Sequence, residues 1–282
     1  MKQEKKSLKI NKNLPLVIGT FDVLHKGHKK LFDQVKPNKF NVILIINSPN
    51  KKEWFSSLLI RYGNINTFHP KKIYFFDAKQ NNISAIDFIK HYLKILCPSK
   101  IIVGSDFKFG KNQSGNIKLL KKYFKVQAIK YDHKYQTSKI KKLYKEGKVF
   151  EANKLLYSPI IIYDDVKSCK HKGTKLGFPT LNTIPNKNHF IFKEGTYASL
   201  CRLANHKTYY GATCIYKSSG RQIIETHILK DFPKLYKKYN KKIFLSLIAY
   251  IMPFKKISNE ENLIKYIKTS VNAVKEFFRI KP

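Results

Sequence analysis

The sequence predicts an α/β domain with a parallel sheet, followed by an antiparallel β-barrel that ends in a helix. Two observations carry this prediction. Up to about residue 130, short apolar runs alternate with stretches of helical spacing, which is the pattern of β–α–β crossovers in a parallel sheet with covered faces. After residue 158, runs of β-branched and aromatic residues follow one another with turn residues between them, which is typical of antiparallel strands.

The first half contains strand-sized apolar runs separated by helical stretches. We expect strands at 14–18, 42–46, 73–76, 101–103 and 126–129, with helices at about 25–36, 84–96 and 115–123. Two short helices should follow within 139–156, with a break at Gly147. Tyr157-Ser158-Pro159 then ends the helical pattern, because the residue before a proline disfavours the helical conformation.

The second half has a different periodicity. Its apolar runs indicate strands at 159–166, 195–203, 208–216, 221–229 and 241–251. A last helix should extend from about Asn259 to Phe278, since its apolar residues recur on one stripe. These patterns divide the chain into a basic tail at 1–13, a first domain at 14–157 and a second domain at 158–282.

The 282-residue chain carries a formal net charge of +38, which by itself indicates a nucleic-acid or membrane partner. Only four of its 56 basic residues are arginine, however, and the lysines are spread along the whole chain. Both features are typical of the codon usage of an AT-rich genome, which raises charge without selecting a partner. The positive charge is also compatible with small anionic substrates such as nucleotides. We therefore expect the binding partners to be nucleotides and not nucleic acid.

The composition also bears on the cellular compartment. No apolar run approaches the ~20 residues that cross a bilayer, and the lysine-rich first residues lack the apolar stretch of a secretory signal. The four cysteines are scattered, without a Cys-x-x-Cys pair or a neighbouring histidine ligand pattern. We therefore expect a cytoplasmic protein with reduced thiols and no membrane partner.

The most informative segment is residues 19–28, Gly-Thr-Phe-Asp-Val-Leu-His-Lys-Gly-His, which joins the first expected strand to the first helix. Free N–H groups at a helix start attract anions, and Gly27 lets a phosphate approach the backbone closely. His25 and His28 add hydrogen-bond donors that are neutral or cationic near pH 7. The alternative is a strand–turn–helix with two surface histidines. The Gly-x-Phe-Asp that precedes the histidines favours a phosphate site.

A second signal lies at the end of the strand expected at 101–103, which leads into Gly104, Asp106, Phe107 and Phe109. Ligands of α/β folds bind at the C-terminal ends of strands. Gly104 allows close passage, and Asp106 can hold a hydroxyl or amine of a ligand. Phe107 and Phe109 can line a base or another ring. The alternative is a loop that packs its own aromatic side chains.

A third signal is Thr137-Ser138-Lys139-Ile140-Lys141, which opens a helix. Hydroxyls at a helix start usually cap the free N–H groups, and this is the structural alternative. The same hydroxyls and N–H groups, with Lys141 one turn further, also have the chemistry of a phosphate clamp.

In the second half, residues 173–182 read Gly-Thr-Lys-Leu-Gly-Phe-Pro-Thr-Leu-Asn. Gly173 and Gly177 make a flexible loop that a phosphate can approach. Thr180 and Asn182 are alternate residues of an extended segment and project to the same side, where a hydroxyl and an amide suit Mg²⁺ and phosphate oxygens. Composition alone is equally consistent with a turn that enters a barrel strand.

Taken in order, the segments at 19–28, 103–110 and 136–141 resemble the FMN adenylyltransferase half of bacterial bifunctional riboflavin kinase/FAD synthetases. The resemblance implies a Rossmann-like domain of the HxGH nucleotidyltransferase superfamily. It implies that His25 and His28 hold the ATP phosphates while the phosphate of FMN attacks the α-phosphorus. Lys141 stands where the family has arginine, which removes a planar bidentate donor.

The second half resembles riboflavin kinase through Gly-Phe-Pro-Thr-Leu-Asn at 177–182 and Glu-Thr-His-Ile-Leu-Lys-Asp-Phe at 225–232. The resemblance implies that Glu225 is the catalytic base for the ribityl hydroxyl and that Thr180 and Asn182 hold Mg²⁺. His227 is more simply interpreted as structural. Several family positions differ here, including Cys169 for a glycine and the turn at 211–219, and these departures concern flavin binding more than phosphate chemistry.

The resemblance implies nucleotide-binding roles for residues of both domains. They are Gly19, Phe21, Asp22, Gly27, Gly104, Asp106, Phe107, Phe109, Gly110, Thr137, Ser138 and Lys141 in the first domain, and Gly173, Gly177, Phe178 and Pro179 in the second.

The expected function is therefore the conversion of riboflavin to FMN and of FMN to FAD, with ATP as co-substrate and Mg²⁺ as cofactor. Two alternatives stay open at this point. One is an FMN adenylyltransferase whose kinase domain has decayed, against which the retained Gly-Phe-Pro-Thr-Leu-Asn and Glu225 argue. The other is a basic nucleic-acid-binding protein on this scaffold, which would bind nucleic acid with a strong salt dependence and turn over no flavin.

Overall fold

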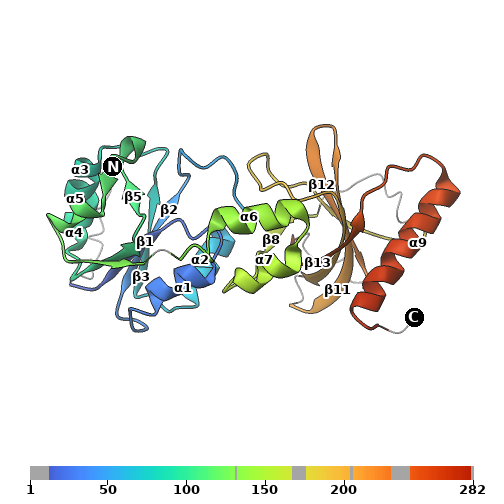
Figure 1. Cartoon of the computed structure of the whole chain (residues 1–282), viewed down its shortest axis with the longest axis horizontal. Coiled ribbons are helices and arrows are strands. Elements are labelled where there is room, and N and C mark those ends of the chain that lie inside the picture. The colour runs from blue at the N-terminus through green and yellow to red at the C-terminus, as the bar shows by residue number, and fades with distance from the viewer. Residues whose placement is uncertain (1–12, 131, 167–175, 204–205, 230–241, 281–282) are drawn as a thin grey trace, which may run out of the picture. The chain divides into compact units, whose positions relative to one another are not determined.

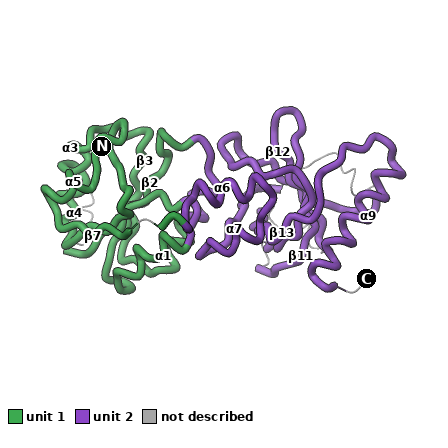
Figure 2. Tube along the Cα trace, viewed as in Figure 1, with its two compact units in different colours: residues 1–21, 26–51, 62–133 green, residues 22–25, 52–61, 134–282 purple. Residues whose placement is uncertain are grey.

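The computed structural model describes residues 13–130, 132–166, 176–203, 206–229 and 242–280. The chain forms two compact units, seen as ribbons in Figure 1 and in separate colours in Figure 2. Unit 1 consists of residues 1–21, 26–51 and 62–133, and unit 2 consists of residues 22–25, 52–61 and 134–282. Neither unit is one continuous stretch of sequence. The division into domains at residue 157 stays a prediction.

Unit 1 is built on a five-stranded sheet with the strand order β3-β2-β1-β4-β7. Its strands are β1 (Leu16–Gly19), β2 (Asn41–Ile46), β3 (Lys72–Asp77), β4 (Ile101–Gly104) and β7 (Val126–Ile129). Every neighbouring pair is parallel, which confirms the α/β half of the predicted fold. The strand order reverses at β1 and β4, and sheets of this kind bind ligands beside the C-terminal ends of such strands.

Short helices connect these strands. They are α1 (Lys26–Phe32), α3 (Ala85–Phe88) with the π-helical turn η1 (Ile89–Leu93) and α4 (Lys94–Leu96), and α5 (Ile117–Lys121). Further elements that the sequence pattern does not predict are α2 (Leu58–Asn66), which includes residues of both units, and the hairpin β5 (Lys108–Phe109) and β6 (Gly115–Asn116) around the 3-10 turn η2 (Lys111–Gln113).

The core of unit 1 covers both faces of the sheet. Leu16, Val17 and Ile18 of β1 point alternately to the two faces, and each is at most 2% exposed. Ile101 and Ile102 of β4 are fully buried in the same way. Strands that are covered on both sides are apolar at successive positions, which is why these runs are readable in the sequence.

Unit 2 is built on an antiparallel six-stranded sheet with the order β8-β13-β10-β11-β12-β9. The strands are β8 (Ile162–Asp165), β9 (Leu181–Thr183), β10 (Gly195–Arg202), β11 (Thr208–Ser218), β12 (Arg221–Ile228) and β13 (Lys242–Pro253). The sheet curves into the predicted barrel (Figure 1), and this confirms the second half of the predicted fold. The short strand β9 is a further element that the sequence pattern does not predict.

Two helices, α6 (Thr137–Glu146) and α7 (Val149–Leu155), pack on this barrel. Gly147 lies between them at a φ of +81°, a left-handed conformation that favours glycine, and it ends α6 as expected. The Tyr144 hydroxyl donates to Asn153 Oδ1 at 2.6 Å, and Asn153 Nδ2 donates to the carbonyl of Leu247 in β13 at 3.0 Å. Tyr144 is itself 1% exposed within the barrel core, so both helices are fixed to unit 2.

The last helix, α9 (Glu260–Phe277), agrees with the predicted one. Its N-cap is Asn259, whose side-chain oxygen accepts from the backbone N–H of Asn262 at 3.0 Å. Val271 and Val274 pack with Ala198 and Ala212 of the barrel. Among the helices that the structure describes, none is long and apolar enough to cross a membrane.

Candidate functional site

The C-terminal end of β1 is shaped by one close packing contact. Phe21 has a φ of +46°, and its ring lies over Gly19, where a Cβ would come within 2.7 Å of Phe21 Cζ. Only glycine fits beneath the ring. The same ring meets His28 edge-on, with centroids 5.3 Å apart, and His28 lies in the first turn of α1 beside Gly27. Unit 1 therefore brings Gly19, Phe21 and His28 together, and a role for them in phosphate binding stays a prediction.

His25 is assigned to unit 2 and is buried, with 7% of its surface exposed. Its backbone N–H donates to the carbonyl of Val23 at 3.0 Å, and the residue forms an isolated antiparallel bridge with Leu156. Burial lowers the pKa of His25 from 6.5 to about 4. Its imidazole is therefore neutral at pH 7, and it can offer a phosphate a single N–H donor.

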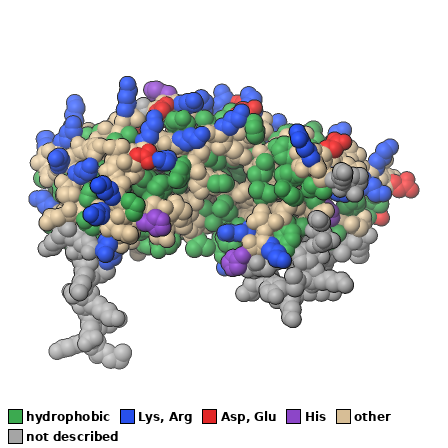
Figure 3. Space-filling model, turned by 90° about the horizontal axis from the view of Figure 1, so that it is seen from below, with side chains coloured by type: hydrophobic (Ala, Val, Ile, Leu, Met, Phe, Trp, Pro, Cys, Tyr) green, Lys and Arg blue, Asp and Glu red, His purple; other side chains and the backbone are tan. Residues whose placement is uncertain are grey.

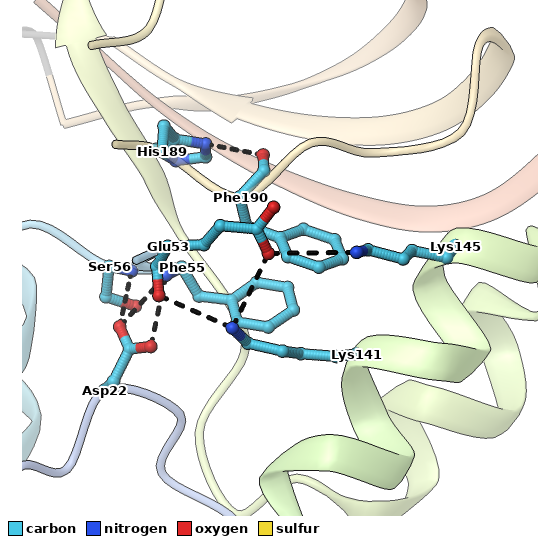
Figure 4. A network of polar contacts seen from close by, with 8 residues as sticks. All are labelled: Asp22, Glu53, Phe55, Ser56, Lys141, Lys145, His189 and Phe190. Carbon is cyan, nitrogen blue, oxygen red and sulfur yellow. Dashed lines mark hydrogen bonds and ion pairs between the residues drawn. The ribbon is translucent and has the colours of Figure 1, made fainter. Parts of the chain in front are cut away.

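Asp22 is held in a buried polar network of unit 2 (Figure 4). It is 1% exposed, and its Oδ1 accepts from the backbone N–H groups of Phe55 and Ser56, both at 3.0 Å. Arg61 is also buried and lies 4.4 Å above the Trp54 ring. Burial lowers the pKa of Arg61 to about 10, and the charge of Asp22 opposes this shift. The carboxylate thus anchors the segment 54–61, and a ligand-binding role for Asp22 stays a prediction.

The expected phosphate clamp lies at the start of α6. Thr137 and Ser138 occupy its first turn, and the Ser138 hydroxyl donates to Gln136 Oε1 at 3.3 Å. Lys141 Nζ is 3.6 Å from Glu53 Oε2 and 3.4 Å from the Glu53 carbonyl oxygen (Figure 4). Lys145 Nζ is 3.8 Å from the same Glu53 carboxylate. Both lysines of this helix face are thus oriented by one acidic residue that the sequence motifs do not single out.

The segment after β4 forms a tight structure in unit 1. A Cβ on Gly104 would lie 2.9 Å from Asp106 Oδ1, so the carboxylate sits directly over the Gly104 backbone. The rings of Phe107 and Phe109 are stacked, with centroids 5.7 Å apart. Gly110 has a φ of +74°, and a Cβ there would come within 2.5 Å of the Ala85 backbone nitrogen.

A pocket of about 240 Å³ opens beside this segment within unit 1. It is lined by apolar and amide side chains, namely Ile45, Pro49, Asn50, Phe76, Ala78, Asn81, Asn82, Ile83 and Phe88, together with Asp106, Lys108, Phe109, Gly110, Lys111 and Gln113. Flat aromatic walls with a few amide, cationic and carboxylate groups are the chemistry that binds a polar fused ring. Asp106, Phe109 and Gly110 are thus brought together, and the asparagines beside them belong to no motif of the sequence.

In unit 2, Glu225 of β12 pairs in register with Asn182 of β9 on one side and with Cys214 of β11 on the other. The Tyr216 hydroxyl donates to Glu225 Oε1 at 2.9 Å. Burial raises the pKa of Glu225, and the hydrogen bond from Tyr216 opposes that shift. A carboxylate whose pKa is raised toward neutrality is suited to take a proton from a hydroxyl.

Asn182 is 7% exposed, and its Oδ1 is buried without a hydrogen-bond partner among the described residues. A buried carbonyl oxygen left in this state costs free energy unless a ligand satisfies it. An amide oxygen is a suitable ligand for a hard cation that also binds nucleotide phosphates, so Asn182 fits a place in a Mg²⁺ site. Within the described part of the chain, no group of three or more His, Cys, Asp or Glu side chains is arranged so that it could hold a metal ion.

The loop before β9 is close to the same group of residues. His227 Nδ1 lies 2.9 Å from the carbonyl oxygen of Pro179, and its ring meets Phe178 edge-on. This contact supports the structural interpretation of His227. Gly177 is exposed with a φ of +84°. Gly173 and Cys169 lie outside the described residues.

These features are typical of a two-part nucleotide-using enzyme, with a parallel α/β unit and an antiparallel barrel that carries the partly buried carboxylate of Glu225. Comparison with known families agrees. The FAD synthetase family model matches residues 7–148, and the riboflavin kinase family model matches residues 156–278. The chain therefore belongs to the FAD synthetase family and carries a riboflavin kinase region.

Several curated proteins are similar along most of the chain. The trifunctional protein RibF/MnmA of Mycoplasmoides gallisepticum is 34% identical over 95% of this chain, which spans 41% of that protein's length. The bifunctional riboflavin kinase/FMN adenylyltransferase of Buchnera aphidicola subsp. Schizaphis graminum is 29% identical, with 96% of each chain covered. The protein of the same description from Mycoplasma pneumoniae is 27% identical, with 93% of this chain and 97% of the relative covered.

Among solved structures, a crystal structure described as a macrolide-efflux protein from Streptococcus pneumoniae has a TM-score of 0.78. It is 21% identical, and 96% of each chain is covered. At this identity the likeness shows the fold alone.

We expect Asp22→Asn to destabilise the protein strongly, because it leaves the buried Arg61 cation without its counter-charge. The free energy of unfolding should fall by about 3 kcal/mol in urea titrations followed by circular dichroism. The matched control is Asp33→Asn, which removes an exposed carboxylate paired with Lys29 and should cost less than about 1 kcal/mol. Equal losses in the two variants would contradict the anchoring role of Asp22.

Acid should destabilise the protein partly through His25. Its folded pKa of about 4 lies below the unfolded value of 6.5, so the unfolded chain binds the proton first as the pH falls. Stability should therefore drop between pH 6.5 and 4, by about 3 kcal/mol for this group. In His25→Gln, the loss of stability over this pH range should be smaller by about 3 kcal/mol. His189 and His227, whose pKa values burial also lowers, contribute to the loss that persists in the variant. If the free energy of unfolding fell equally with pH in the wild type and in His25→Gln, the contribution of His25 would be refuted.

Proposed function

We propose that this chain makes FAD from riboflavin in two ATP-dependent steps. The riboflavin kinase region phosphorylates riboflavin to FMN, and the FAD synthetase region transfers an adenylyl group from ATP to FMN. The observation that carries the proposal is the register of β12 with β9, which pairs Glu225 with Asn182, whose side-chain oxygen has no hydrogen-bond partner among the described residues.

In the kinase step, Glu225 accepts the proton of the ribityl 5′-hydroxyl as that oxygen attacks the γ-phosphorus of ATP. The bond from the γ-phosphorus to the bridging oxygen breaks, ADP leaves and FMN is formed. Thr180 and Asn182 hold Mg²⁺, which when bound neutralises charge on the transferring phosphoryl group. Phe178, Pro179 and the glycines Gly173 and Gly177 bind the nucleotide.

In the adenylyl step, a phosphate oxygen of FMN attacks the α-phosphorus of ATP, and pyrophosphate leaves. His25 and His28 donate hydrogen bonds to the phosphates, and no protein nucleophile takes part. Thr137, Ser138 and Lys141 hold the polyphosphate, with Glu53 orienting the lysine before ATP binds.

The pocket beside β4 is the candidate site for the flavin ring of FMN. Phe76 and Phe109 supply apolar ring surface, and Asn50, Asn81 and Asn82 supply amides for the polar edge of the isoalloxazine.

The protein acts in the cytoplasm, where ATP is abundant, and its partners are the small molecules riboflavin, FMN and ATP. The retained pairing of Glu225 with Asn182 argues against a decayed kinase, since a domain without function has no reason to keep it. Basic side chains are scattered among apolar and polar ones on the face in Figure 3, which argues against a nucleic-acid stripe.

Purified protein incubated with riboflavin, ATP and Mg²⁺ should yield FAD when the flavins are resolved chromatographically. FAD formed from added FMN but not from riboflavin would overturn the kinase assignment. No new flavin from either substrate would overturn both activities.

Single substitutions should separate the two steps. Glu225→Gln removes the base, so FMN formation should fall by roughly 10²–10⁴-fold while FMN-to-FAD conversion stays near wild type. His28→Ala should have the opposite effect, stopping FAD synthesis and sparing the kinase. The activity that each variant retains shows that the variant is folded. A folded variant that lost both activities would rule out separate sites.

The metal dependence of the kinase tests Asn182. In Asn182→Ala, the Mg²⁺ concentration that gives half-maximal FMN formation should rise roughly tenfold, because one oxygen donor is lost. The Mg²⁺ dependence of FAD formation from FMN in the same variant is the internal control. An unchanged requirement in the kinase step would remove Asn182 from the metal site.

A further inference from the structure

One contact of the proposed base involves a residue outside the motifs. Tyr216 lies two positions after Cys214 on β11, so both side chains point to the same face of the sheet. Because Cys214 is directly opposite Glu225, Tyr216 is the diagonal neighbour of the carboxylate. The Tyr216 hydroxyl donates to Glu225 Oε1 at 2.9 Å.

The ring of Tyr216 is itself held in place. It stacks on Phe254, which follows β13, with ring centroids 5.0 Å apart and planes within 9°. A ring stacked in this way loses little further freedom when its hydroxyl makes a hydrogen bond, so the donor is already aimed at the carboxylate.

The geometry leaves one carboxylate oxygen available. Among the described residues, Tyr216 is the hydrogen-bond donor to Glu225, and it uses Oε1. Oε2 can therefore accept a hydrogen bond from a substrate hydroxyl. A hydrogen bond to the ionised form of a carboxylate stabilises that form, which a partly buried base needs if it is to accept a proton.

We propose that Tyr216 is a positioning residue of the kinase reaction, which orients Glu225 through Oε1 so that Oε2 faces the ribityl hydroxyl and takes its proton. The inference rests on the proposed riboflavin kinase function.

The test is Tyr216→Phe, which keeps the ring and its stacking on Phe254 and removes the hydroxyl. At pH 7, kcat for FMN formation should fall roughly tenfold, with KM for riboflavin within about twofold of wild type. A fall in kcat with little change in KM is the signature of a positioning residue, because the substrate still binds and the proton transfer is slowed.

Two controls accompany it. Tyr210→Phe removes an exposed hydroxyl from the same strand and should leave kcat and KM unchanged. Phe254→Leu keeps the Tyr216 hydroxyl but frees its ring, and should lower kcat in the same direction by a smaller factor. FMN-to-FAD conversion and circular dichroism report the folding of each variant.

The outcomes separate the two claims. Active wild-type kinase with an unchanged kcat in Tyr216→Phe overturns the role of Tyr216 alone. A rise in KM for riboflavin as large as the fall in kcat also overturns it, because a merely disturbed binding site would give that result. Wild-type protein that forms no FMN from riboflavin overturns the kinase function, and the role of Tyr216 with it.

Discussion

The antiparallel pairing of β11, β12 and β9 is the constraint on which the chemistry of the barrel depends. Ile224 and Ile228 of β12 are buried in the barrel core, and the alternation of a strand sends Glu225 to the opposite face. A slip by one residue would bury the carboxylate and expose the isoleucines, so the apolar core itself fixes the register. The same alternation on β11 brings Cys214 and Tyr216 to the face of Glu225. Packing therefore determines which polar atoms meet.

In unit 1, the candidate functional side chains are positioned by close packing against backbone and not by strand register. These side chains lie beyond strand ends, where no ladder of hydrogen bonds can hold them. Close backbone approach takes the place of the ladder: the Phe21 ring covers Gly19, and the Asp106 carboxylate covers Gly104. Both glycines are the last residues of adjacent parallel strands, β1 and β4. Side chains on loops are thereby positioned with the rigidity of the sheet.

Most of the fold could be predicted because its long elements repeat a period, as in the buried strands of unit 1 and the apolar stripe of α9. The helix at 58–66 could not be predicted, because Leu58 and Leu59 are exposed and Gly63 interrupts the apolar pattern. Strand β9 could not be predicted either, because three residues are too few to show a period. The motifs singled out the candidate phosphate and base residues. They could not reveal Glu53, whose partner Lys141 is 88 residues away, or the donor Tyr216, because such contacts exist only once the chain has folded.

The composition of unit 2 has a consequence for how such proteins can be assembled from parts. Val23 and Phe55, both at most 1% exposed, belong to the same buried cluster as the barrel strands, although they come from short stretches far upstream. A protein that contained only residues 134–282 would lack both side chains, which would leave two cavities in its hydrophobic core. A single recombination event that transferred the sequence of the barrel strands would therefore not transfer its complete core. The short upstream segments that carry Val23 and Phe55 would have to be transferred as well.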